Sequence, residues 1–312
     1  MLRATTLTAL ILAAALPARA ADEPESCADV TLAEVGWTDI AATTGVAVTL
    51  LNALGYQTKT EMLALPVTFQ SLARGDVDVF LGNWMPTMET LIRPYLDAKQ
   101  IDVVRVNLEG AKYTLATTDA MAEKGLKDFA DIAKFKDDLD GRIYGIEPGN
   151  DGNKIITDMI AQNAFGLGDF KLVESSEQAM LAQVARDQKS GAGVVFLGWE
   201  PHPMNVNIPM TYLTGGDAWF GPGFGGSTVS TLTRTGYATD CPNVGRLLQN
   251  LGFTLDMENE IMGLILELGE KPEAAAANWI GSHGEMINGW TEGVTARDGG
   301  PGDAAVRGAL GL

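Results

Sequence analysis

The sequence predicts an α/β protein made of two similar halves. Two observations favour this class: strand-like and helix-like segments alternate along the chain, and the order of the first half recurs in the second. Such alternation is typical of a largely parallel sheet whose faces are covered by helices. With 312 residues, the chain is long enough for about two domains of roughly 150 residues each.

In the first half, three apolar strand-like runs enclose two helix-like segments. The first helix is predicted because apolar residues recur every three or four positions from Val46 to Leu54, and Gly55 stands where helices commonly end. The second begins at Pro66, a residue favoured in the first turn. The expected order is a strand at 30–35, a helix at 44–54, a strand at 56–63, a helix at 66–74 and a strand at 77–81.

The second half repeats this order. Its fourth segment is expected to be a helix that opens at Ser175, with Gln178 in the capping-box position. Both halves contain the run Val-Phe-Leu-Gly, at 79–82 and 195–198, followed closely by tryptophan and proline. We interpret this as a duplicated α/β half. The expected segments are a strand at 142–147, a helix at 152–165, a strand at 171–174, a helix from 175 and a strand at 194–197.

Residues 1–20 are expected to be a secretory signal peptide. Arg3 supplies the charged start, residues 7–16 form a short apolar run, and Ala18-Arg19-Ala20 is a small-x-small cleavage site. The apolar run is far shorter than the roughly 20 residues that span a bilayer. We therefore expect a mature chain that begins at Ala21 and is exported.

Cys27 and Cys241 are the two cysteines of the chain. In an oxidising compartment two cysteines usually pair, so we expect a Cys27–Cys241 disulfide; two free buried thiols are the alternative. A bond would bring the start of the mature chain and a late segment into one domain.

The expected domain organisation follows from that bond. Residues 21–110 and 216–312 form a discontinuous domain I, and residues 111–215 form domain II, inserted into it. The chain crosses between the domains on two strands that act as a hinge. Gly110 and Gly215-Gly216 stand at the crossings, where glycine can absorb backbone rotation.

Composition excludes several classes of partner. The formal net charge of -18 repels nucleic acids and anionic lipid surfaces, so we expect no nucleic-acid partner. Two histidines and two cysteines are too few for an all-protein zinc site, and no cofactor or metal is expected.

Three of the six tryptophans are candidates for a binding site. Trp37, Trp84 and Trp199 each follow the end of a predicted strand by a few residues, on what we expect to be loops. Ligands of open α/β sheets bind beyond the carboxyl ends of the strands. Packing in the core or between domains is the alternative for each ring, and we assign Trp219, Trp279 and Trp290 to such packing.

Several aromatic faces in an acidic protein suit a quaternary ammonium cation, which lacks N–H donors and binds π-faces. Asp39, beside Trp37, can supply charge or accept a hydroxyl; an ordinary helix cap is the alternative. Tyr113 opens the strand after the first crossing, where it faces the cleft or packs within the sheet. Asn150, in the Gly-rich loop at 147–152, hydrogen-bonds a ligand hydroxyl or caps the helix that follows.

The chain resembles the substrate-binding proteins of ABC-type importers for glycine betaine, proline betaine and choline. The resemblance is carried by Gly75-Asp76-Val77-Asp78-Val79 through Trp84, by Val35-Gly36-Trp37 and by Glu147-Pro148-Gly149. It implies a two-lobed periplasmic binding protein of type II, a Venus-flytrap fold. It also implies an aromatic box around the trimethylammonium group, formed by Trp37, Trp84, Tyr113 and Trp199, with Asp39 and Asn150 near the hydroxyl end.

The resemblance further implies choline as the principal ligand and acetylcholine as a second one. Glycine betaine or proline betaine is the alternative, but Asp151 in the Gly-rich loop disfavours a ligand carboxylate. The partner would be the membrane permease of an ABC importer. We expect a monomer that is soluble in a Gram-negative periplasm after signal cleavage.

A secreted α/β hydrolase is the remote alternative, and we predict that the protein is not an enzyme. Asp76 and Asp78 share a face of a strand, where a solvated edge is the simpler interpretation. His202 lies between two prolines without a sequence signature that links it to a nucleophile.

Overall fold

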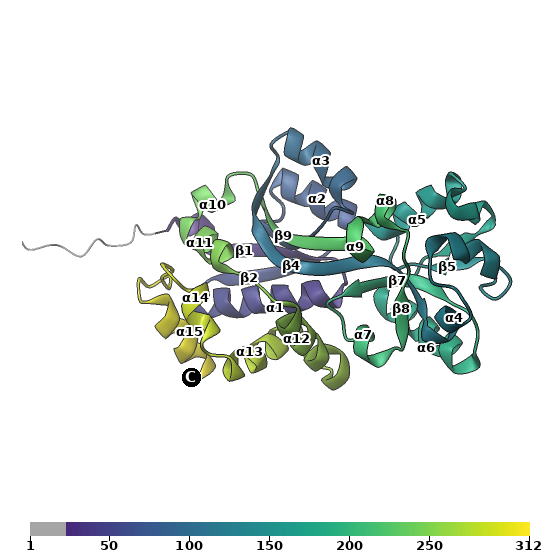
Figure 1. The fold of residues 1–312 in the computed structure, drawn as a ribbon. Helices are drawn as coiled ribbons and strands as arrows, with labels where there is room; N and C mark the ends of the chain where they lie inside the picture. The colour runs from purple at the N-terminus through teal and green to yellow at the C-terminus, as the bar shows by residue number, and fades with distance from the viewer. Residues whose placement is uncertain (1–22) are drawn as a thin grey trace, which may run out of the picture.

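The computed structural model describes residues 23–312; the expected signal peptide at 1–20 lies outside them. In the described part, nine strands form one continuous sheet that runs through two helix-covered lobes (Figure 1). The strands are β1 Asp29–Glu34, β2 Gln57–Met62, β3 Val79–Met85, β4 Ile101–Thr118, β5 Arg142–Tyr144, β6 Lys171–Val173, β7 Val195–Glu200, β8 Met210–Tyr212 and β9 Gly226–Arg234.

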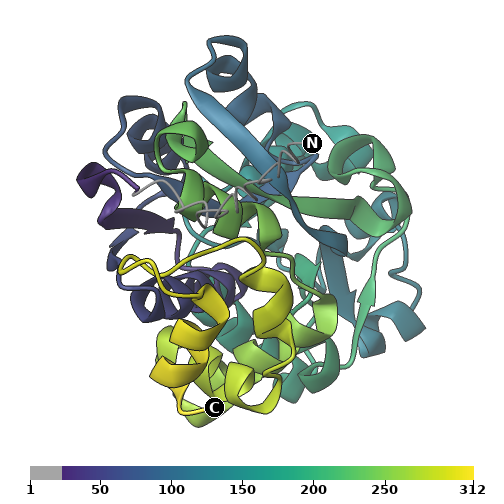
Figure 2. The same cartoon turned by 90° about the vertical axis from the view of Figure 1, so that its left-hand side faces the viewer.

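Helices pack on both faces of this sheet. The α-helices are α1 Thr38–Ala53, α2 Leu65–Arg74, α3 Glu89–Asp97, α4 Asp119–Glu123, α5 Asp151–Ala161, α6 Glu177–Ser190, α7 Met204–Asn207, α8 Asp217–Phe220, α9 Pro222–Gly225, α10 Tyr237–Asp240, α11 Pro242–Asn250, α12 Leu255–Leu268, α13 Pro272–Ser282, α14 Met286–Trp290 and α15 Gly302–Leu310. Three 3₁₀ segments accompany them: η1 Glu25–Cys27, η2 Phe129–Phe135 and η3 Ala164–Asp169. Helices α2 and α3 lie on the side of the sheet opposite α1, α12 and α13 (Figure 1), and the C-terminal helices gather beside α1 (Figure 2).

The sheet consists of two parallel units joined by two antiparallel strands. The strand order is β2-β1-β3-β9-β4-β7-β5-β6, and β8 pairs with β4. β1 runs parallel to β2 and β3, and β5 runs parallel to β6 and β7. Strand β4 pairs with β9 up to Lys112 and with β7 from Lys112 to Thr117, so it belongs to both units. The predicted α/β class is confirmed.

We call residues 23–110 and 216–312 lobe I and residues 111–215 lobe II, after the boundaries expected from the sequence, which stay a prediction. The Cys27–Cys241 disulfide is present, with the two Cα atoms 5.6 Å apart. The alternative of two free thiols is therefore wrong. The bond ties η1 to the start of α11 and holds both ends of lobe I together.

Several predicted boundaries are wrong. β3 and β7 extend to Met85 and Glu200, so Trp84 and Trp199 lie in strands and not on loops. The cause is pairing with distant strands: Trp84 faces Val229 of β9, and Trp199 faces Tyr113 of β4.

Two helix starts also differ from the prediction. Helix α1 begins at Thr38, six residues earlier than the apolar spacing indicates, because its first turn is buried and its polar residues carry no apolar signal. Helix α6 is capped by Ser176, whose side chain accepts from the backbone N of Ala179, so the capping box predicted at Ser175 and Gln178 is absent.

Candidate functional site

All six residues predicted to bind ligand border one pocket at the junction of the lobes. The pocket is small, with about 270 Å³ of space between its lining atoms when open solvent is included. It suits a ligand smaller than a typical drug. Its lining consists of Trp37, Asp39, Trp84, Tyr113, Ile146, Asn150, Asp151 and Trp199.

Both lobes contribute to this lining. From lobe I, Trp37 ends the turn after β1 as the N-cap residue of α1, and Trp84 lies near the end of β3. From lobe II, Tyr113 on β4 and Trp199 on β7 are direct partners in the antiparallel ladder. The pocket therefore exists in this form only when the lobes are together.

The four aromatic rings are inclined to one another where they meet. The Trp84 and Tyr113 centroids lie 6.0 Å apart at 60°, and those of Tyr113 and Trp199 lie 6.4 Å apart at 80°. Each of the four side chains is at most 5% exposed. A cation in this buried pocket would be desolvated, which strengthens its attraction to an aromatic face to about 2 kcal/mol per ring.

Polar atoms fix three of these rings. Trp37 Nε1 donates to Glu147 Oε1 at 2.7 Å, across the lobes, and Trp84 Nε1 donates to Asp39 Oδ2 at 3.1 Å. The Tyr113 hydroxyl donates to Asn150 Oδ1 at 2.9 Å. Each ring is thus held by its polar edge, which is the arrangement expected of aromatic side chains that present their faces to a ligand.

Asn150 caps the helix that follows it, whereas its hydrogen bond to a ligand hydroxyl stays a prediction. Its Oδ1 accepts from the backbone N of Asn153 at 3.1 Å, which caps α5, while the residue also lines the pocket. The following Gly152 permits this arrangement, because a Cβ there would lie 2.1 Å from the Tyr113 hydroxyl. Asp39 differs: it lies in the first turn of α1 and is not the N-cap, so the helix-cap alternative is wrong.

Two buried carboxyl groups give the pocket an uncompensated negative character. Asp39 Oδ1 and Asp151 Oδ2 have no hydrogen-bond partner, and both residues are 2% exposed. Burial, reinforced by the negative charge of Glu177, raises the pKa of Asp39 to about 7. Burial raises the pKa of Asp151 to about 6. Within the described residues no Lys, Arg or His lines the pocket, so a cation would supply the charge that these groups lack.

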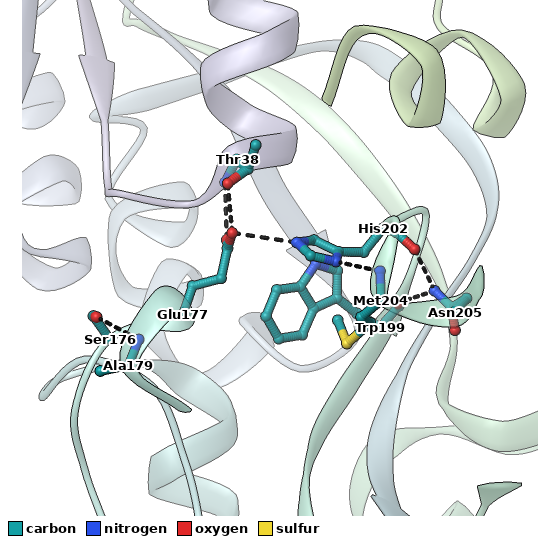
Figure 3. A network of polar contacts seen from close by, with 8 residues as sticks. All are labelled: Thr38, Ser176, Glu177, Ala179, Trp199, His202, Met204 and Asn205. Carbon is teal, nitrogen blue, oxygen red and sulfur yellow. Dashed lines mark hydrogen bonds and ion pairs between the residues drawn. The ribbon is translucent and has the colours of Figure 1, made fainter. Parts of the chain in front are cut away.

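A polar network behind the pocket was missed by the sequence analysis. Glu177, at the start of α6, is fully buried and contacts Thr38 and His202 (Figure 3). An acidic residue just after an N-cap is ordinary in the first turn of a helix, and nothing local distinguishes Glu177. Ile146 was also missed, since a single apolar residue carries no signal.

The groups considered for catalysis have structural partners. Asp78 accepts from the backbone N of Thr31 at 2.9 Å and from Arg234 Nε at 2.8 Å. His202 Nδ1 accepts from the backbone N of Met204 at 2.9 Å. These contacts hold β1, β9 and the turn after β7 in place and account for the polar groups that could otherwise suggest acid–base chemistry.

The described residues contain neither a membrane-spanning helix nor a cluster of metal ligands. Among residues 23–312, no helix combines the length and apolar composition needed to cross a bilayer. In the same part of the chain, no cluster of three His, Cys, Asp or Glu side chains is placed to hold a metal ion.

Known proteins resemble this chain over most of its length. A choline-binding protein of an ABC transporter, solved with choline, is 61% identical, covers 92% of this chain over its whole length and superposes with a TM-score of 0.91. The unliganded semi-closed form of an ABC-transporter choline-binding protein, with the same identity and coverage, gives 0.86. The lactococcal glycine betaine-binding OpuAC, in its closed liganded form, is 27% identical, covers 84% of this chain and 98% of its own, and gives 0.75.

These neighbours are two-lobed substrate-binding proteins of transport systems, which confirms the predicted fold and the prediction that the chain is not an enzyme. Residues 28–282 match the family described as the substrate-binding domain of ABC-type glycine betaine transport systems. The chain belongs to this family.

Proposed function

We propose that the protein binds choline in the aromatic pocket outside the cytoplasm and delivers it to the permease of an ABC importer. The observation that carries the proposal is the combination of four desolvated rings with two unpaired carboxyl oxygens around one small pocket. A trimethylammonium group satisfies both, since it is a cation without N–H donors. Support also comes from the 61% identical protein that was solved with choline.

The rings supply part of the free energy that tight binding needs, and other contacts supply the rest. At about 0.5–2 kcal/mol per ring, four rings give several kcal/mol, whereas a micromolar site needs about 8 kcal/mol. Burial of the methyl groups, at about 0.8 kcal/mol per buried carbon, and a hydrogen bond from the ligand hydroxyl supply the remainder. Asp39 Oδ1 and Asp151 Oδ2 are free to accept that bond.

The same carboxyl oxygens discriminate between ligands of the family. Glycine betaine would place its carboxylate where Asp39 and Asp151 already supply unpaired acceptors, and like charges repel in a buried site. Acetylcholine keeps the cation but has no hydroxyl donor, so it should bind more weakly than choline. Glycine betaine is the second candidate, because the 27% identical lactococcal neighbour was solved with it.

Delivery depends on closure of the lobes. The rings come from both lobes, so a bound cation bridges them and stabilises the closed state that a permease would recognise. We infer that the protein acts as a monomer in a Gram-negative periplasm, which agrees with the extracytoplasmic location of importer binding proteins.

Titration calorimetry with choline, acetylcholine and glycine betaine tests the proposal. We expect choline to bind tightest and Trp199→Ala to weaken its binding by about tenfold or more. Trp219→Ala, a half-buried tryptophan outside the pocket, is the matched control and should leave choline affinity unchanged. Tightest binding of glycine betaine, or equal affinity in Trp199→Ala and the wild type, would contradict the proposal.

A further inference from the structure

Glu177 of lobe II reaches across the junction to the N-terminus of α1 in lobe I. One carboxylate oxygen accepts from the backbone N of Thr38 at 2.9 Å, and the other accepts from the Thr38 hydroxyl (Figure 3). The N-cap residue of α1, Trp37, makes no side-chain cap. Since the first N–H groups of a helix need acceptors and favour negative charge, Glu177 supplies from the other lobe the cap that α1 lacks.

His202 links the same carboxylate to the pocket. The backbone N of Met204 can only donate, so His202 Nδ1 is the acceptor of their 2.9 Å bond and the ring proton resides on Nε2. That Nε2–H donates to Glu177 Oε1 at 3.2 Å. The His202 ring meets Trp199 edge-on, with centroids 5.1 Å apart at 69°. Glu177 therefore accepts hydrogen bonds from Thr38 of lobe I and from His202, whose ring contacts Trp199.

The contacts to lobe I concentrate on one short segment. Thr38 lies between Trp37 and Asp39, which both line the pocket, and Trp37 itself donates to Glu147 of lobe II. Two lobe II carboxyl groups thus hold the turn between β1 and α1. When the lobes separate, these bonds break and water must solvate Glu177, which is 0% exposed in the closed form.

From this geometry we infer that Glu177 is a positioning residue that latches the closed lobes and fixes Trp37 and Trp199 around the bound cation. The inference deepens the proposed function and rests on it. The chain superposes better on the choline-bound neighbour (TM-score 0.91) than on the semi-closed one (TM-score 0.86). This difference fits a closed arrangement in which Glu177 contacts Thr38. The latch acts on the lifetime of the complex, because it forms only after the lobes have met.

Glu177→Gln tests this role. The glutamine amide has one acceptor oxygen, so its NH₂ group must face a donor, either Thr38 N–H or His202 Nε2–H. We expect choline to dissociate about tenfold faster or more, with Kd raised in parallel and the association rate within about twofold. The melting temperature without choline should match the wild type, because the open form leaves residue 177 in water. Glu123→Gln, an exposed glutamate of lobe II, is the matched control for charge.

Thr38→Val gives a second, independent measurement. It removes the hydroxyl that donates to Glu177 and leaves the carboxylate and His202 in place. In a double-mutant cycle on choline affinity, the effects of Thr38→Val and Glu177→Gln should be non-additive, since both break one contact between lobes. Thr38→Ser, which keeps the donor, should restore wild-type dissociation. If Glu177→Gln fails to fold, dissociation from Thr38→Val and Thr38→Ser still decides the question.

The outcomes separate the two proposals. A wild-type protein that does not bind choline overturns the proposed function. Tight choline binding with unchanged dissociation in Glu177→Gln, or additive effects in the cycle, overturns the latch alone. Loss of ligand-free stability equal to the loss of affinity would assign Glu177 to the folding of lobe II and would also overturn the latch.

Discussion

Replacing Asp39 with asparagine should stabilise the closed form of the ligand-free protein and weaken its binding of choline. Burial, with a contribution from the charge of Glu177, raises the pKa of Asp39 from 3.8 to about 7 in the closed form. At 1.36 kcal/mol per pKa unit, holding this group ionised costs the closed form about 4 kcal/mol relative to an open form in which the carboxylate is solvated. The asparagine amide places an N–H group at the unpaired Oδ1 position, which costs about 1–3 kcal/mol. A net gain of about 1–3 kcal/mol is expected at pH 8.

The sign of the pH dependence follows from the direction of the shift. An acid whose pKa is higher in the closed form opposes closure once the pH exceeds its pKa in the open form, and the cost grows until the pH passes the closed-form value. Through Asp39, closure of the wild type should therefore become about 1 kcal/mol more favourable between pH 8 and pH 6. Asp39→Asn lacks this gain. Its advantage over the wild type should be about 1 kcal/mol smaller at pH 6 than at pH 8.

Interlobe distance measurements on both proteins at the two pH values, without choline, give the closed fraction and therefore this difference. Asp137→Asn, at an exposed position of lobe II, is the control and should show no such change. Calorimetry at pH 8 should find choline affinity reduced by about tenfold or more in Asp39→Asn, since a buried charge next to the cation is lost. The reasoning is refuted if Asp39→Asn has a smaller closed fraction than the wild type at pH 8 without choline, or if its advantage does not depend on pH.

Three further outcomes are expected. Asp151→Asn should lower the ratio of choline to glycine betaine affinity by about tenfold, because one source of repulsion for a carboxylate is removed; an unchanged ratio in competition calorimetry would contradict this. Trp37→Phe keeps an aromatic face but loses the donor to Glu147, so choline should dissociate several-fold faster in stopped-flow measurements, and an unaltered rate would show that the bond is dispensable. Replacing Cys27 and Cys241 together with serine should lower the free energy of unfolding by about 2–5 kcal/mol, measured with urea; a loss below about 1 kcal/mol would contradict a stabilising bond.

Local patterns predicted the alternating strands and helices of the two parallel units, because apolar spacing and helix-end residues are visible in the sequence. The spacing from Val46 to Leu54 identified the body of α1, and the helix predicted to begin at Pro66 agrees with α2 to within a residue. The ends of β3 and β7 could not be predicted. They depend on β9 and β4, which lie far away in the sequence, and antiparallel pairing between distant strands has no signature in either strand alone.

Some residues of the binding site could likewise be predicted from the sequence, and others could not. Trp37, Trp84 and Trp199 could be grouped from sequence because each follows a predicted strand, and the carboxyl ends of parallel strands meet at one edge. Glu177 and His202 could not, because their roles come from a contact between α6 and α1 that forms only when two lobes meet. A cap supplied from another lobe looks, in the sequence, like an ordinary acidic residue in a helical first turn.

The two sets of carboxyl groups at the junction have opposite effects on closure. Glu177 gains hydrogen bonds from Thr38 when the lobes meet, so it favours the closed form. Asp39 and Asp151 lose water and leave one oxygen each unpaired, so closure of the empty protein is opposed by their burial. A bound cation compensates these carboxyl groups and so removes their opposition to closure, while the hydrogen bonds of Glu177 remain. Since a ligand shifts an equilibrium only by its differential interaction with the two states, these buried charges contribute, together with the rings of both lobes, to the closure that choline induces. Neutralising Asp39 should therefore raise the closed fraction of the empty protein, and neutralising Glu177 should lower the closed fraction of the complex, two opposite changes that an interlobe distance measurement can separate.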